Sequence, residues 1–275
     1  MQIAVTYHED FGHYGFVVLR DRVIPSFTCL REYIKEGKVK VFTPEITDET
    51  RRLVEAVHTR DHIEDVRDSG YLSVSMLSVA SVVQAAELLA KGEFPAAFAY
   101  VGAAGHHASR RGFWGFCYLN DVAAAILKLR EMGFKRFLIL DVDPHFGDGT
   151  RNILGKDADV IHINFDTSTG NRFDKEYNNF DYGLGLAKDE VFLSAVDEAL
   201  RPEYVFDMMI VIFGHDSHAY DYGGFSLTYS AYPELARRVK RYAANRPLLW
   251  VLSGGSEVDV ACRVIPDIIG VLTED

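Results

Sequence analysis

The segment best suited to chemistry covers residues 137–150, where the apolar run FLIL leads directly into three carboxylates, a histidine and two glycines. Because side chains alternate along a strand, Asp141, Asp143 and His145 are expected on one side of the chain. Carboxylate oxygens beside an imidazole nitrogen suit zinc or ferrous iron better than calcium or magnesium. Carboxylates crowded together also repel one another unless a cation or hydrogen-bond donors offset their charge. The pattern therefore predicts a metal site that includes Asp143 and His145.

A third ligand must come from elsewhere in the chain. A second apolar run, residues 208–213, ends in Gly214-His215-Asp216. In open α/β sheets, ligands bind at the carboxyl ends of the strands, so the ends of these two runs are expected to meet. Asp216 is the natural third ligand, and His215 or His218 could take its place.

Two adjacent histidines, His106 and His107, follow the apolar run at 96–101. Histidine is the usual general acid and base near neutral pH. A ring gains basicity and a fixed tautomer when its far nitrogen donates to a carboxylate, and Asp141 and Asp148 are the spare carboxylates. The pattern predicts histidines that move protons beside the metal.

An aromatic, glycine-rich stretch at residues 112–121 precedes an expected helix. Such rings could wall a narrow apolar channel beside a metal. Core packing explains Phe113 and Trp114 equally well at this stage, and Asn120 or Asp121 could cap the helix.

The elements that must position these residues follow from the alternation of short apolar runs and amphipathic stretches. The expected strands lie near residue 3 and at 96–101, 137–143, 159–165, 208–216 and 248–255. The expected helices cover 47–59, 75–92, 119–133, 188–203 and 230–245. Apolar runs of this length are typical of strands buried on both faces. We therefore predict a three-layer α/β fold, with a mainly parallel sheet between helices.

The composition suits one folded domain over residues 1–275, because no linker or repeat divides the 275 residues. The net charge of −11 argues against binding to nucleic acid phosphates. Three scattered cysteines indicate no disulfide framework and favour the cytoplasm. There is no leader pattern, and no apolar run approaches the roughly 20 residues that span a bilayer, so no membrane is expected. The oligomeric state stays open.

In their order along the chain, these segments resemble the histone deacetylase superfamily, which includes acetylpolyamine amidohydrolases. The residues that carry the likeness are Gly105-His106-His107-Ala108, Gly115-Phe116-Cys117, Asn120-Asp121, Asp141-Val142-Asp143-Pro144-His145, Gly147-Asp148-Gly149, Gly214-His215-Asp216 and Gly254-Gly255. The likeness spans most of the chain, and it implies an arginase-deacetylase fold.

The resemblance also implies a cofactor. It places Zn²⁺, with Fe²⁺ as an alternative, on Asp143, His145 and Asp216. A structural K⁺ is common in the family near Asp141, Asp143 and His145. A bound metal would polarise the substrate carbonyl and lower the pKa of its water towards about 7.

The same resemblance implies roles for the two adjacent histidines. His107 would be the general base, oriented by Asp148. His106 would be its companion, paired with Asp141.

On the channel side, the resemblance places Gly115 and Phe116 in the walls. The sequence departs from the family where a Gly-Gly-Tyr motif normally supplies a tyrosine that donates to the oxyanion, because Ser256 occupies that place. A serine hydroxyl reaches several ångströms less far, and a lost oxyanion donor costs roughly 10²–10³ in rate. We expect Tyr220 and Ser256 to line the channel, with Tyr220, Tyr222 or a partner residue as the replacement donor.

The expected function is hydrolysis of an acylated amine, such as acetyl-lysine or an acetylpolyamine, to a free amine and a short-chain acid. We expect weak activity on ordinary acetyl-lysine. A small substrate is favoured over histone, because the segment around Gly70-Tyr71-Leu72 lacks the rim aspartate of lysine deacetylases. The main alternative is a non-catalytic protein that binds metal and acyl ligands. A dinuclear, arginase-like ureohydrolase would need more bridging carboxylates than the sequence offers.

Overall fold

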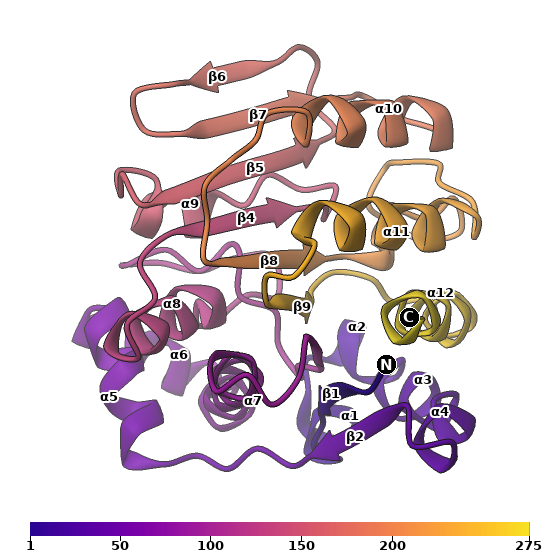
Figure 1. Cartoon of the computed structure of the whole chain (residues 1–275). Helices are drawn as coiled ribbons and strands as arrows, with labels where there is room; N and C mark the ends of the chain where they lie inside the picture. Colours follow the sequence, from indigo (N-terminus) through magenta and orange to yellow (C-terminus); the bar gives the residue numbers. More distant parts are fainter. Residues whose placement is uncertain (275) are drawn as a thin grey trace.

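The computed structural model describes residues 1–274 and is built on one nine-stranded β-sheet (Figure 1). The strands are β1 (Ile3–Thr6), β2 (Val39–Phe42), β3 (Ala96–Ala99), β4 (Phe137–Asp141), β5 (Val160–Asp166), β6 (Arg172–Asp174), β7 (Asn179–Gly183), β8 (Met208–Phe213) and β9 (Leu248–Leu252). Their order across the sheet is β2-β1-β3-β9-β8-β4-β5-β7-β6. All neighbouring strands are parallel except β6 and β7.

Helices flank this sheet in two groups. They are α1 (Asp10–Tyr14), α2 (Val17–Arg20), α3 (Val23–Thr28), α4 (Arg31–Lys35), α5 (Asp48–Val57), α6 (Arg60–Asp68), α7 (Leu72–Ala90), α8 (Asp121–Glu131), α9 (Asp148–Leu154), α10 (Asp189–Ala199), α11 (Ala231–Ala243) and α12 (Val258–Thr273). Helices α5, α7 and α8 pack on one another, while α10 packs on α11, α11 on α12 and α12 on α3. Figure 1 shows the sheet between the two groups. The predicted α/β fold with a mainly parallel sheet is confirmed.

All six expected strands and all five expected helices are present, with ends shifted by a few residues. The elements that sequence reasoning missed are short, such as β2, β6 and helices α1 to α4, or lack a clean pattern. Helix α12 contains Pro266 in its interior, which reads as a break in the sequence.

Helix α7 differs from expectation in its length and hydropathy. Its 19 residues are long and apolar enough to cross a membrane by length and composition, although no run of that kind was expected. The share of its most apolar window that is buried inside the protein is 78%. It lies against β1, β3 and α8, so its apolar surface is the surface of a core helix.

The strand order brings the chemical segments together. Strands β3, β9, β8 and β4 are consecutive neighbours in the sheet although they are far apart in the sequence. The His-His pair follows β3, the Gly-Gly pair follows β9, and the two segments rich in carboxylates follow β8 and β4. All four therefore leave the same edge of the sheet side by side, as expected at a change of strand order in an open α/β sheet.

Two buried hydrogen-bond networks fix the loop that carries the histidines. Ser78, on α7, accepts from the backbone N–H groups of Gly102 and Ala103 at 3.0 and 3.2 Å. Asn120 caps α8 through the N–H of Ala123, as the sequence suggested, and its amide also donates to the carbonyl of Ala108. The loop is thus tied to helices on both sides of the histidines.

Replacing Ser78 by Ala should lower the free energy of unfolding by about 1–3 kcal/mol, because two buried N–H groups lose their acceptor. Urea unfolding monitored by circular dichroism measures this change. Ser73, exposed on the same helix, provides the control, and Ser73→Ala should change stability by no more than about 0.5 kcal/mol. Equal stabilities of the two variants would contradict the role of Ser78.

Candidate metal centre

Three side chains that can ligate a metal meet at the carboxyl edge of the sheet. Asp143 and His145 follow β4, and Asp216 lies in a short 3₁₀ helix, η1 (His215–Ser217), after β8. His145 Nδ1 lies 2.9 Å from an oxygen of Asp143 and 3.2 Å from an oxygen of Asp216. One ligand atom from each residue lies within 4.8 Å of the others. The structure therefore places the three expected ligands in one cluster.

The carboxylate of Asp216 shows that this cluster fits a cation. It is fully buried, and neither oxygen has a hydrogen-bond partner within residues 1–274. Burial and the neighbouring Asp143 raise the pKa of Asp216 to about 7. Burial also acts to raise the pKa of Asp143, but the charge of His106 and the hydrogen bond from His145 hold it well below its usual range. A buried carboxylate without a donor calls for a cation, and the nitrogen and oxygen donors suit zinc or ferrous iron.

Two glycines let the backbone pass close to these carboxylates. A β-carbon on Gly254 would lie 2.3 Å from an oxygen of Asp216 and 2.7 Å from one of Asp143. A β-carbon on Gly214 would meet the same two carboxylates at 2.3 and 2.4 Å. These contacts are far too short for any side chain, so both positions require glycine. The Gly254 N–H then donates to Asp143 at 2.9 Å.

Sequence reasoning missed Arg22, which holds the segment after β9 in place beside the cluster. Its guanidinium is fully buried and donates to the carbonyl oxygens of Ser253 and Gly254. These contacts join residues more than 200 positions apart, at the start and the end of the chain. No local sequence pattern around Arg22 predicts these contacts.

The two alternative ligands that the sequence left open lie elsewhere. His215 Nδ1 lies 3.0 Å from a carboxylate oxygen of Asp221. The ring of His218 packs against Tyr229, with centroids 4.3 Å apart. Only Asp216, of the three candidates after β8, joins the cluster.

Each of the adjacent histidines meets the carboxylate that the resemblance assigned to it. His106 Nδ1 lies 3.0 Å from Asp141, and His107 Nδ1 lies 2.7 Å from Asp148. Both rings are buried. A carboxylate at Nδ1 holds the proton on that atom and leaves Nε2 free to accept another.

The two histidines differ in charge at neutral pH. Burial lowers the pKa of His106, but the charges of Asp143 and Asp141 outweigh it and raise the value to about 9. Burial and the charge on His106 lower the pKa of His107 to about 4. His107 is therefore neutral at pH 7 and can act as a base, while His106 carries a proton.

Trp114 belongs to the site and not to the core. Its ring stacks on His107 with centroids 3.8 Å apart, and its Nε1–H donates to Asp148 at 2.9 Å. Trp114 remains 54% exposed. Gly115 follows with a φ of +58°, and a β-carbon there would lie 2.6 Å from the His107 ring. Phe113, in contrast, packs inward against Tyr118.

These groups surround a cavity of about 250 Å³. It is lined by Val18, Leu19, Ala104, His106, His107, Trp114, Gly115, Phe116, Asp143, His145, Asp216, Tyr222, Ser253 and Gly254. Apolar side chains form most of the wall, and the polar groups gather at the ligand cluster. Gly115 and Phe116 thus lie where the resemblance placed them, whereas Val18 and Leu19 were not foreseen.

Two residues that were expected to line the channel lie outside it. Tyr220 is 73% exposed, and its ring packs against His218. The Ser256 hydroxyl donates to Asp221 at 3.1 Å, so it is turned away from the cavity. Tyr222, which the sequence offered only as a replacement donor, is a wall residue.

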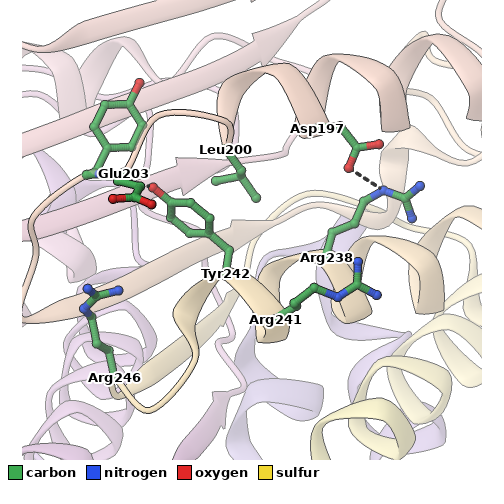
Figure 2. Close-up of a pocket in the computed structure, with 8 residues that line it drawn as sticks. Asp197, Leu200, Glu203, Arg238, Arg241, Tyr242 and Arg246 are labelled. Atoms are coloured by element: carbon green, nitrogen blue, oxygen red, sulfur yellow. Dashed lines mark hydrogen bonds and ion pairs between the residues drawn. The ribbon is translucent and has the colours of Figure 1, made fainter.

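A larger hollow of about 560 Å³ lies between α10 and α11 and has a different character. Figure 2 shows Asp197 paired with Arg238 on one side and Arg246 on the other. No histidine lines it, and it contains none of the predicted ligands. Although this hollow is larger, it lacks the residues that could bind a metal through imidazole and so is not the candidate site.

The sheet, the Asp-His-Asp cluster and the two His-Asp pairs together define an α/β protein of the arginase-deacetylase fold with a site suited to a metal. The histone deacetylase domain family matches residues 21–272. The chain therefore belongs to the histone deacetylase family.

Individual relatives agree with this assignment. The chain is 28% identical to histone deacetylase 5 of Arabidopsis thaliana, over 81% of this chain and 41% of that protein. It is 30% identical to a probable deacetylase of Archaeoglobus fulgidus (70% and 58%) and 29% identical to acetylpolyamine amidohydrolase of Mycoplana ramosa (68% and 59%). The chain thus spans roughly 40 to 60% of the length of these relatives. The crystal structure of the HDA15 HD domain shares the fold, with a TM-score of 0.85 and 21% identity over 99% of this chain and 89% of that one.

Replacing Asp216 by Asn should abolish metal binding without destabilising the metal-free protein, because it removes a buried carboxylate that repels Asp143. Thermal unfolding with and without added zinc tests both parts. Zinc should raise the Tm of the wild type and of an Asp197→Asn control, but not that of Asp216→Asn. A full zinc-induced shift in Asp216→Asn would contradict the assignment.

Zinc affinity should fall as the pH falls, because the metal displaces protons. The hydrogen bond to Asp143 and the nearby carboxylate of Asp216 raise the pKa of His145 to about 10, so zinc must displace a proton from His145 near neutral pH. Below pH 7, zinc binding must also displace the proton of Asp216, so two protons leave in all. We expect about a tenfold weakening per pH unit from pH 9 to 7.5 and a steeper one below pH 7. Competition with a chelator of known proton affinity measures this slope, and a flat profile would contradict it.

Proposed function

We propose that this chain is a zinc-dependent amidohydrolase that releases a short acyl group from a small acylated amine, such as an acetyl-lysine or an acetylpolyamine. Fe²⁺ is the alternative metal. The observation that carries the proposal is the buried carboxylate of Asp216, which accepts no hydrogen bond within residues 1–274. It lies beside Asp143 and His145 at a cavity that is also lined by the histidines of two His-Asp pairs. Membership of the deacetylase family supports the same chemistry.

When bound by Asp143, His145 and Asp216, a divalent ion would supply a Lewis acid for the carbonyl and for water. The protein's own groups do the remaining work. His107 Nε2 accepts the proton of the attacking water, and Asp148 stabilises the charge that the ring then carries. Trp114 keeps the ring and the carboxylate aligned through its stacking and its N–H.

The shape and charge of the site support a small acyl group on a cationic amine. A cavity of about 250 Å³ with mostly apolar walls favours an acyl chain and an aliphatic stem over a bulky or charged acid. The net charge of −11 attracts a polyamine or lysine-like amine to the protein.

One observation favours a second candidate, a protein that binds acyl ligands without turning them over. By the family resemblance, Ser256 stands where a tyrosine is expected, and its hydroxyl donates to Asp221. Such a protein would bind metal and ligand as proposed but would release no acid.

Replacing His107 by Ala should reduce turnover of trifluoroacetyl-lysine, an activated substrate, by about 10²–10⁴-fold, because the general base is lost. Acid release measures turnover, and elemental analysis checks that the zinc content is unchanged. His13 is an exposed histidine on α1 and provides the control, and His13→Ala should have the turnover of the wild type. Zinc-loaded wild type that binds the substrate but releases no acid would support the non-catalytic candidate instead.

A further inference from the structure

Hydrolysis of an amide places negative charge on the carbonyl oxygen, and this charge needs a hydrogen-bond donor. Ser256 cannot serve from its position, because its N–H and its hydroxyl both donate to Asp221. Tyr220 cannot serve either, since it lies outside the cavity. If the proposed function is correct, the donor must be another residue of the cavity wall.

Tyr222 is the one phenol in that wall. Its ring lies 6.1 Å from the ring of His145 and stands perpendicular to Phe116 at 6.2 Å. Its hydroxyl oxygen accepts the N–H of Gly255 at 3.0 Å, and the preceding N–H, of Gly254, donates to Asp143. Two consecutive peptide groups therefore hold a metal-ligating carboxylate and the tyrosine hydroxyl next to each other.

The direction of this hydrogen bond matters. Because the hydroxyl oxygen of Tyr222 accepts, its own hydrogen is not used in the contact with Gly255, and within residues 1–274 the hydroxyl has no other hydrogen bond. The hydrogen can therefore point towards a ligand in the cavity. Burial, reinforced by the charge of Asp216, raises the pKa of Tyr222 well above its usual range, so the phenol keeps its proton.

The loop that carries Tyr222 is anchored on both sides. The N–H of Tyr222 donates to Asp221 at 2.9 Å, and the N–H of Gly223 donates to the carbonyl of Asp216 at the same distance. A β-carbon on Gly223 would lie 2.4 Å from the ring of Pro144, so the loop packs directly on the segment that precedes His145. These contacts fix the tyrosine relative to the ligand cluster.

We propose that Tyr222 is a catalytic residue that donates a hydrogen bond to the developing oxyanion, from the loop after β8 instead of from the end of β9. This inference rests on the proposed hydrolysis. The water oxygen bonds to the carbonyl carbon, the π electron pair moves onto the carbonyl oxygen, and a proton passes to His107. Tyr222 keeps its own proton throughout. The carbonyl then reforms as the carbon–nitrogen bond breaks and the amine takes a proton from the histidine.

The test compares Tyr222→Phe, which removes only the hydroxyl, with Tyr220→Phe, which changes an exposed ring outside the cavity. Turnover of trifluoroacetyl-lysine is measured with the zinc-loaded proteins. Calorimetry gives their affinity for a trifluoromethyl ketone analogue of acetyl-lysine, which hydrates to a tetrahedral diol. We expect Tyr222→Phe to lower kcat by about 10²–10³-fold with little change in KM, and to bind the ketone at least tenfold more weakly. Tyr220→Phe should match the wild type in both measurements, and zinc content should be equal in all three.

Wild-type kcat and wild-type ketone affinity in Tyr222→Phe would overturn the proposal. The binding measurement separates this failure from failure of the proposed function. If the wild type releases no acid but binds the ketone, hydrolysis of this substrate is contradicted, and the loss or retention of ketone affinity in Tyr222→Phe still decides the role of the hydroxyl. A wild type that binds neither zinc nor ketone overturns both.

Discussion

The structure of the site depends on two carboxylates, those of Asp143 and Asp216, that lie together in the protein interior. Burial weakens the solvent screening that would otherwise separate their charges, so their repulsion is large unless something positive lies between them. Asp143 is partly compensated by His145, by the Gly254 N–H and by the charge of His106. Asp216 lies 3.2 Å from His145 Nδ1 but accepts no hydrogen bond within residues 1–274. The cluster is therefore suited to a cation. The backbone passes its oxygens so closely at Gly214 and Gly254 that a β-carbon would not fit there.

The loops that form the site are fastened to one another as well as to the sheet. Arg22 holds the carbonyl oxygens of the segment after β9 from the N-terminal part of the chain. Asp221, in the loop after β8, accepts the N–H groups of Ser256 and Glu257 and lies against His215. Such cross-links matter because loops at strand ends lose most of the hydrogen bonding that the sheet provides. The ligands can then stay in place even though they follow two different strands, β4 and β8.

The sequence was sufficient for the features that depend on local pattern. Apolar runs predicted six of the nine strands of the sheet, and the polar residues at the ends of two of them predicted the cluster of Asp143, His145 and Asp216. The His-Asp pairings required the family resemblance, because the spacing of His106 and Asp141 does not specify which carboxylate faces which ring.

The features that were missed depend on contacts between distant segments. Leu19 lies in the short helix α2 and Arg22 in the turn before α3. Nothing nearby in the sequence shows that they reach the cavity or the end of β9. The orientation of Tyr220 and Tyr222 was equally hidden, because alternation rules hold along a regular strand but not in a loop. The loop turns Tyr220 outward and Tyr222 towards the cavity. The hydrogen bonds at Asp221 and Gly223 hold this arrangement.

The proposal for Tyr222 assigns the oxyanion donor to a different chain position from the one at which the family resemblance expects it, that of Ser256. An oxyanion donor is defined by where its hydrogen lies relative to the carbonyl oxygen, and not by the strand from which it comes. The N–H of Gly255, the residue before Ser256, donates to the hydroxyl of Tyr222. The serine hydroxyl meanwhile adds a hydrogen bond to Asp221, the residue that also receives the N–H of Tyr222. Ser256 therefore helps to hold the loop that carries Tyr222, the proposed oxyanion donor.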